Sequence, residues 1–215
     1  MKPPRNLVLR IGRLCGACVA MAWFSLSCLG QGTLQIGFDA PPLQPPGTSY
    51  FVQQYFESGM WFRPLGVVEP GNGFSHRRGG GQLAGVVPDN ATSYLAAAFG
   101  DSLKFSFLND SLFGVSSVDL AGYSSVVPDF SIRFVGYRPD GSMVTADFSG
   151  SGLNFRTFYF GSEFSGLSRV ETSDIGWSLD NLVVSIPEPD AWALLMLGGG
   201  VTWLPLFARK QKLKH

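Results

Sequence analysis

Short segments in which apolar and polar residues alternate are the feature that most limits how this chain can fold. Leu103–Phe107 (LKFSF) and Phe130–Phe134 (FSIRF) alternate at every position, as expected for strands with one face in a core and one in water. Helical periodicity is scarce, and Ser93–Phe99 (SYLAAAF) is a candidate for only a helical turn or two. Pro139-Asp140-Gly141 has the composition of a tight turn between strands.

Further strands are predicted wherever the alternation continues between polar or glycine-rich turns. The expected segments are Thr33–Phe38, Met60–Arg63, Ser117–Leu120, Ser142–Phe148, Leu153–Phe160, Leu167–Thr172 and Ile175–Val184. Short antiparallel strands in such number indicate an all-β fold, an antiparallel β-sandwich.

The segment Gly66–Pro88 shows no sustained alternation and is expected to be a mobile surface loop, or alternatively a binding loop at one end of the sandwich. It contains His76, the one histidine between residues 31 and 187. A Ser/His/Asp triad would need this histidine in a flexible loop, where catalytic geometry is hard to hold. The carboxylates are scattered, so we predict that the protein is not an enzyme.

The first 30 residues have the three parts of a secretory signal peptide, which directs a chain to the Sec export machinery. An apolar stretch, Leu14–Phe24, follows a basic start and precedes a small-residue exit. Cleavage is predicted between Gly30 and Gln31. All three cysteines lie before that site, so the mature chain has no thiol chemistry, and lipidation at Cys28 is the less favoured alternative. The basic residues are Lys2, Arg5, Arg10 and Arg13.

The C-terminal residues 186–215 also have three parts. Pro187-Glu188-Pro189 precedes an apolar stretch, residues 191–208, which is just long enough to span a thin bilayer as a transmembrane helix. A basic tail follows, residues 209–215, and its cations would hold the C-terminus in the cytoplasm. These cations are Arg209, Lys210, Lys212 and Lys214.

This arrangement resembles the PEP-CTERM sorting signal of Gram-negative bacteria, with Pro187-Glu188-Pro189 in the place of the name-giving motif. An ordinary membrane anchor is the alternative. The resemblance implies an exported precursor that is held in the inner membrane until an exosortase processes it. It further implies delivery to the cell surface or the extracellular space, often alongside exopolysaccharide. It covers about 28 residues and indicates sorting, not activity.

The ectodomain, residues 31–185, differs in charge from the whole chain. The full sequence has 16 Lys and Arg and 16 Asp and Glu. Residues 31–187 hold 8 of the basic and 14 of the acidic residues, a net charge of about −6. An acidic domain disfavours nucleic acid as a partner and suits a soluble extracellular role.

The segment Gly176–Val184 (GWSLDNLVV) alternates with one parity up to Leu179 and with the opposite parity from Leu182. A β-bulge is therefore predicted at Asp180-Asn181. An aromatic strand that ends in this way resembles the last strand of galactose-binding-like jelly rolls. In such folds the first and last strands are often neighbours and a structural Ca²⁺ can lie near them. The resemblance implies calcium at Asp39 and Asp180; alternatively, Asp180 bonds backbone amides at the bulge and Asp39 begins a loop.

Two functions follow from these observations. The first is a structural surface protein associated with exopolysaccharide, and the alternative is a carbohydrate-binding module of jelly-roll type. Sugar platforms are usually Trp or Tyr. Both tryptophans of the domain, Trp61 and Trp177, fall in apolar runs and are expected in the core. The tyrosines expected at the surface are Tyr50, Tyr55, Tyr94 and Tyr123.

Overall fold

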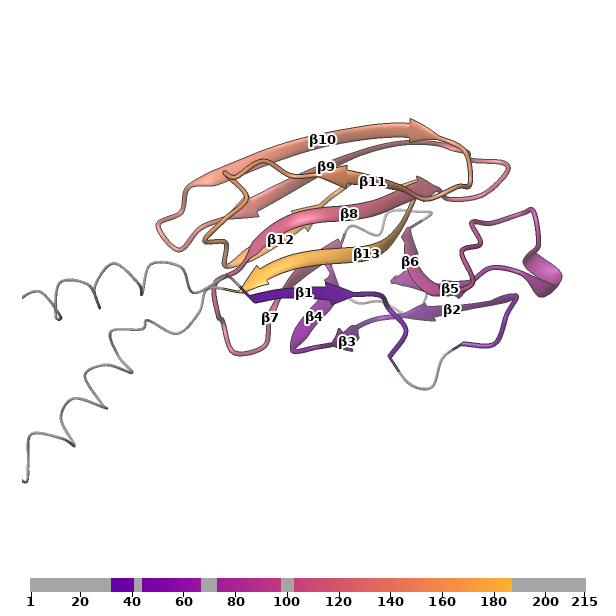
Figure 1. Cartoon of the computed structure of the whole chain (residues 1–215), viewed down its shortest axis with the longest axis horizontal. Helices are drawn as coiled ribbons and strands as arrows, with labels where there is room; N and C mark the ends of the chain where they lie inside the picture. The colour runs from indigo at the N-terminus through magenta and orange to yellow at the C-terminus, as the bar shows by residue number, and fades with distance from the viewer. Residues whose placement is uncertain (1–31, 41–43, 67–72, 98–102, 187–215) are drawn as a thin grey trace, which may run out of the picture. The chain divides into compact units, whose positions relative to one another are not determined.

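The computed structural model describes residues 32–40, 44–66, 73–97 and 103–186. These residues belong to one compact unit, residues 32–187, built from antiparallel strands in two sheets (Figure 1). The predicted signal peptide with its Gly30–Gln31 cleavage site lies outside the described residues. So do Pro187-Glu188-Pro189, the apolar stretch and the basic tail. Among the described residues, no helix is both long and apolar enough to cross a membrane.

The first sheet, called sheet A here, has seven strands, and β1 pairs with β13 beside the main order. That order is β11 (Arg156–Tyr159), β8 (Gly114–Gly122), β13 (Trp177–Ile186), β6 (Ser93–Ala97), β5 (Phe74–Arg78) and β2 (Thr48–Val52), with β1 at Gly32–Ile36.

The second sheet, sheet B, has six strands. Their order is β10 (Met143–Ser151), β9 (Asp129–Tyr137), β12 (Arg169–Thr172), β7 (Leu103–Phe107), β4 (Met60–Pro64) and β3 (Tyr55–Glu57). From β6 to β9 the chain changes sheet at every step, and it does so again from β10 to β13.

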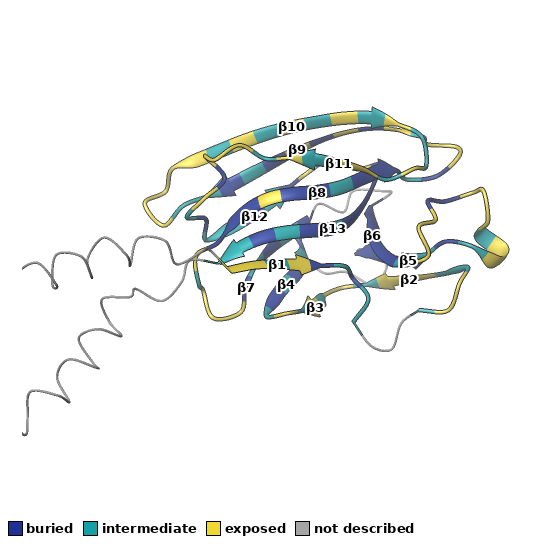
Figure 2. Ribbon diagram, in the orientation of Figure 1, coloured by how far each residue is buried: buried dark blue, intermediate teal, exposed yellow. Residues whose placement is uncertain are grey.

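The core lies between the two sheets and takes side chains from both. Phe105 of β7 and Phe134 of β9 come from sheet B, and Leu95, Trp177 and Leu179 come from sheet A. In β7 and β9 buried and more exposed residues alternate, as predicted (Figure 2). The all-β class and its two antiparallel sheets are thus confirmed, because each sheet buries one apolar face against the other.

Two predictions about local structure were wrong. Ser93–Ala97, expected as a helical turn, is strand β6, and all five of its residues are buried. The predicted loop Gly66–Pro88 contains strand β5, whose residues Phe74–Arg77 are also buried. Both strands lie inside sheet A and are covered on both faces, so neither shows the alternation that marks a half-exposed strand. Strands β2 and β3 were also missed.

Strand β13 is divided in two by the predicted bulge. Its first part, Trp177–Leu179, lies between β8 and β6, whereas Leu182–Ile186 lies between β8 and β1. The pairing with β8 slips between Asp180 and Val183, and Asn181 has a positive φ of 46°. The bulge is confirmed, and it lets one strand bury both Leu179 and Leu182.

Candidate functional site

A chain of hydrogen-bonded polar side chains crosses the outer face of sheet A at the bulge. Gln35 Nε2 donates to Asn181 Oδ1 at 2.7 Å, and Asn181 Nδ2 donates to Asp119 Oδ2 at 2.9 Å. Thr157 Oγ1 donates to Asp119 Oδ1 at 2.6 Å. These four residues, which we call the polar ladder, come from β1, β13, β8 and β11. All four are exposed or half-buried.

The bulge places a buried carboxylate next to the polar ladder. Asp180 is 0% exposed, and its Oδ1 accepts the Asn181 backbone N–H at 2.7 Å. Its Oδ2 accepts hydrogen bonds from Asn90 Nδ2 at 2.6 Å and Thr92 Oγ1 at 2.9 Å. Because the extra residue of a bulge is left out of the ladder, the carboxylate acts as the acceptor for the Asn181 amide.

Burial raises the pKa of Asp180 to about 6, from an ordinary value of 3.8. The hydrogen bonds from Asn90, Thr92 and Asn181 act in the opposite direction, and the nearby negative charge of Asp39 raises the pKa further. Desolvation of the charged form is therefore the dominant effect at this carboxyl group.

The structure brings Asp39 and Asp180 into one region. Asp39 Oδ1 accepts the backbone N–H of Ser93 at 2.7 Å, and Thr92, next to Ser93 in the chain, bonds Asp180. Asp180 thus bonds a backbone amide at the bulge, as the alternative to calcium anticipated, and the amide bond to Asp39 was not anticipated. Among the described residues no group of three or more His, Cys, Asp or Glu is arranged to hold a metal ion. Calcium at Asp39 and Asp180 stays a prediction.

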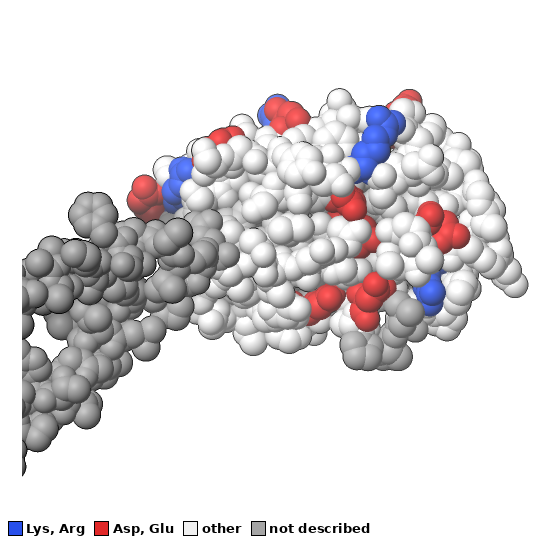
Figure 3. Space-filling view, viewed as in Figure 1, with Lys and Arg blue, Asp and Glu red and all other residues white. Residues whose placement is uncertain are grey.

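Acidic side chains gather over the middle of this face in the space-filling view (Figure 3). The segment that leads into β6 contacts the connection after β8, where Ser125 N donates to the Val86 carbonyl. In the same connection after β8, Tyr123 stacks with Arg77 of β5, whose Cζ lies 4.0 Å from the ring centroid. The Tyr94 hydroxyl is buried and has no hydrogen-bond partner among the described residues.

The predictions for individual aromatic residues met different outcomes. Tyr50 is 51% exposed, as expected, and Trp177 is fully buried in the core, also as expected. Tyr94 is fully buried, which contradicts its predicted exposure, because it lies on β6 beneath Phe155, with ring centroids 5.3 Å apart. Trp61 is only half-buried and lies on the outer face of sheet B, not in the core.

His76 lies on β5, not in a flexible loop as predicted. It is 4% exposed, and its Nε2 lies 2.8 Å from the Phe38 carbonyl oxygen. Burial lowers its pKa below the ordinary 6.5, so the ring is held as a neutral, hydrogen-bonded group. Its burial and its contact with the Phe38 carbonyl are those of a structural residue.

Of the polar ladder, the sequence indicated only the neighbourhood of Asn181, through the change of parity. Gln35, Asp119 and Thr157 are single polar residues in predicted strands, which is the ordinary pattern of a solvated face. What distinguishes them is the register: Thr157 pairs with Asp119, and Asp119 pairs with Asp180. The assembled ladder offers amide, carboxylate and hydroxyl groups side by side, a set that can both donate and accept hydrogen bonds.

No family model matches the chain, and no curated protein matches it. Among solved structures, it is similar to an exo-β-agarase, with a TM-score of 0.38 and 8% sequence identity over 72% of this chain. The match spans 25% of that protein.

Proposed function

We propose that this chain is an exported, non-enzymatic surface protein whose β-sandwich, of jelly-roll type, associates with extracellular polysaccharide. The repeated passage of the chain between the two sheets supports the jelly-roll assignment. The resemblance of residues 186–215 to a sorting signal supports delivery to the cell surface by an exosortase. The domain then has a structural role in the matrix or acts as a carbohydrate-binding module.

The polar ladder is the observation that carries the carbohydrate contact. Sugar hydroxyl groups donate and accept hydrogen bonds, and Gln35, Asn181, Asp119 and Thr157 offer both functions in one line across four strands. Placement on paired strands holds these groups more rigidly than loops would. The adjacent Asp39 and Asp180 are where we propose that a structural Ca²⁺, if bound, would lie.

The binding proposal is tested with the purified exported protein on a panel of neutral polysaccharides, with calcium and then with EGTA. We expect saturable binding, weakened about tenfold by the double change Gln35→Ala and Thr157→Val, because two hydrogen bonds to the sugar are lost. Thr145→Val, an exposed threonine on sheet B, serves as the matched control. Loss of binding in EGTA would support calcium, and the absence of binding to every neutral polysaccharide would leave a structural matrix protein.

The sorting proposal is tested by changing Pro187, Glu188 and Pro189 to alanine in the native host. We expect the protein to stay in the inner membrane fraction, because the exosortase no longer has its recognition motif. Surface labelling of intact cells provides the measurement, and N-terminal sequencing of the exported wild type should begin at Gln31 or within a few residues. Unchanged surface display of the alanine variant would refute the exosortase assignment.

A further inference from the structure

Two aromatic residues and two cations share one region of the outer face of sheet B, away from the polar ladder. Phe56 of β3 pairs with Trp61 of β4, and Arg63 of β4 pairs with Lys104 of β7. The side chains of β4 alternate between the two faces of the sheet, so Met60 and Phe62 point into the core. Phe56 is 49% exposed, and the other three are half-buried. We call these four residues the aromatic–cation patch.

The two cations of the patch face each other without an anion between them. Residues directly opposite in an antiparallel pair have Cβ atoms about 4.5–5.5 Å apart, where like charges destabilise the sheet. Glu171 is the cross-strand neighbour of Lys104 on its other side, but its Oε1 lies 2.7 Å from Arg169 Nε. In the described part of the chain, neither Arg63 nor Lys104 takes part in an ion pair.

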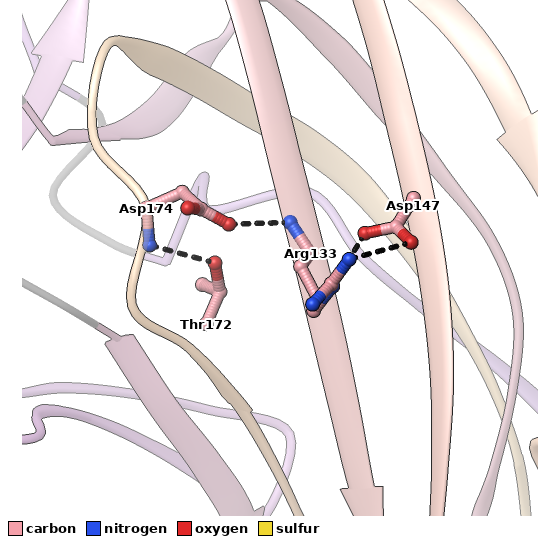
Figure 4. Close-up of polar contacts among 4 residues, drawn as sticks. All are labelled: Arg133, Asp147, Thr172 and Asp174. Carbon is pink, nitrogen blue, oxygen red and sulfur yellow. Dashed lines mark hydrogen bonds and ion pairs between the residues drawn. The ribbon is translucent and has the colours of Figure 1, made fainter.

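The other two cations on the strands of sheet B are each paired with a carboxylate. Arg133 of β9 pairs with Asp147 of β10 through two contacts, of 2.7 and 3.1 Å (Figure 4). The Arg133 backbone N–H donates to the carboxylate of Asp174, which follows β12. This side-chain acceptor stands where the pairing of β9 with β12 has ended. Among the cations on the strands of sheet B, Arg133 and Arg169 are in ion pairs and Arg63 and Lys104 are not, in a domain whose net charge is about −6.

Within the patch, Arg63 is held against the indole ring. Its Cζ lies 4.6 Å from the Trp61 ring centroid, within the range of a cation–π contact. Its Nε is buried and has no hydrogen-bond partner among the described residues. A buried, charged N–H without an acceptor is costly, and a small movement of Arg63 toward an anion bound over the strand would relieve that cost.

We propose that the aromatic–cation patch binds an acidic, carboxylated polysaccharide. Arg63 and Lys104 supply two adjacent positive charges for a sugar carboxylate, and guanidinium groups pair with carboxylates especially well. Trp61 and Phe56 supply flat apolar surface for the C–H face of the neighbouring sugar ring. The proposal goes beyond the polar ladder, which lies on the other sheet, and depends on the proposed function only for the extracellular setting.

The test measures binding of the purified exported protein to polygalacturonate, to its carboxyl-reduced form, to dextran sulfate and to single-stranded DNA. We expect saturable binding to polygalacturonate that weakens with added salt, and no binding to the carboxyl-reduced polymer. The double change Arg63→Gln and Lys104→Gln should lower the affinity at least about tenfold, because charge-assisted contacts are lost. Arg156→Gln, an exposed cation on sheet A, is the matched control and should bind as the wild type does.

Further variants keep the result decisive if the double variant folds poorly. Lys104→Gln alone changes a half-buried surface residue and should still weaken binding. Trp61→Phe should retain more affinity than Trp61→Ala, since a phenyl ring still stacks. Equal binding of polygalacturonate and its carboxyl-reduced form would overturn the proposal, as would preference for DNA or an unchanged affinity in the cation variants. Stronger binding to dextran sulfate would replace the carboxylate with a sulfate as the recognised group and overturn it as well.

This experiment separates the two proposed surfaces. The variants Gln35→Ala and Thr157→Val alter the polar ladder and should leave binding to polygalacturonate unchanged. The cation variants alter sheet B and should leave binding to neutral polysaccharide unchanged. A protein that binds neutral polymers but not polygalacturonate would retain the proposed function and lose only the aromatic–cation patch.

Discussion

At the scale of single residues, Asp180 is the group whose chemistry depends most on its position. It is fully buried at the bulge and accepts three hydrogen bonds, yet desolvation keeps its pKa near 6. Its folded-state pKa therefore lies above the ordinary value of 3.8. The folded protein binds this proton more tightly than the unfolded chain does, so ionisation of Asp180 opposes folding.

The consequence is a pH dependence with a definite sign. The contribution of Asp180 to the free energy of unfolding should be fully present below about pH 4. It should fall as the pH rises towards 6 and stay constant above that value, a loss of roughly 3 kcal/mol. In Asp180→Asn this dependence should vanish. Urea unfolding of both proteins between pH 4 and 7, in EGTA, measures the difference.

Asp129→Asn is the control for the Asp180 experiment, because Asp129 is an exposed carboxylate on β9. The Asp129→Asn variant keeps Asp180 and should therefore retain the loss of stability between pH 4 and 6 that Asp180→Asn removes. If the difference between wild type and Asp180→Asn is the same at pH 4 and pH 7, the carboxyl group titrates alike in the folded and unfolded states. Its burial would then have no energetic consequence for the proton.

At the scale of elements, the connection between β5 and β6 holds two of the three hydrogen-bond donors to Asp180, Asn90 and Thr92. It leaves β5 at Gly79 and comes back to contact that same residue. A Cβ atom at Gly79 would lie 2.4 Å from the Pro88 carbonyl oxygen and 2.5 Å from Asp89 Cβ. The close approach of the two backbones thus requires glycine, and it sets the positions of Asn90 and Thr92.

Gly79→Ala should lower the free energy of unfolding by about 2 kcal/mol, because the backbone around Pro88 must move. Hydrogen exchange at the Ser93 amide, which donates to Asp39, should become faster in the variant, since the connection shifts at its base. Gly66→Ala is the control, as nothing lies within 4 Å of a Cβ atom there. Wild-type stability and exchange in Gly79→Ala would show that the connection can adjust freely.

At the scale of the whole molecule, the sequence predicted those features that depend on residues close together in the chain. Alternation in Leu103–Phe107 and Phe130–Phe134 identified strands, and the parity change at Asp180 identified the bulge. Strands β5 and β6 were missed because burial on both faces removes the alternation. The polar ladder could not be predicted, since Gln35 and Asn181 are 146 residues apart and only the strand order brings them together.

The aromatic–cation patch shows the same limit. Trp61 stands in the apolar run Met60–Phe62, which favoured the core, but alternation along β4 puts its side chain on the other face. Lys104 stands 41 positions after Arg63 and becomes adjacent to it only through the pairing of β4 with β7. The local sequence therefore determines on which face of a strand each side chain lies. The pairing of strands far apart in the chain determines which side chains form a site.

The pairing of β1 with β13 has a mechanical consequence. Gly32 lies opposite Ile186, so the strand pair opens at the end where the chain enters and leaves the domain. Tension between those two points would peel the strands apart one hydrogen bond at a time. Tension between Ile186 and a polymer held on either sheet would instead pull β13 lengthwise against β8 and β1, and many bonds would have to shear together. A domain anchored only through the end of β13 would therefore resist a force applied through its bound ligand. It would resist a force applied between Gly32 and Ile186 far less well.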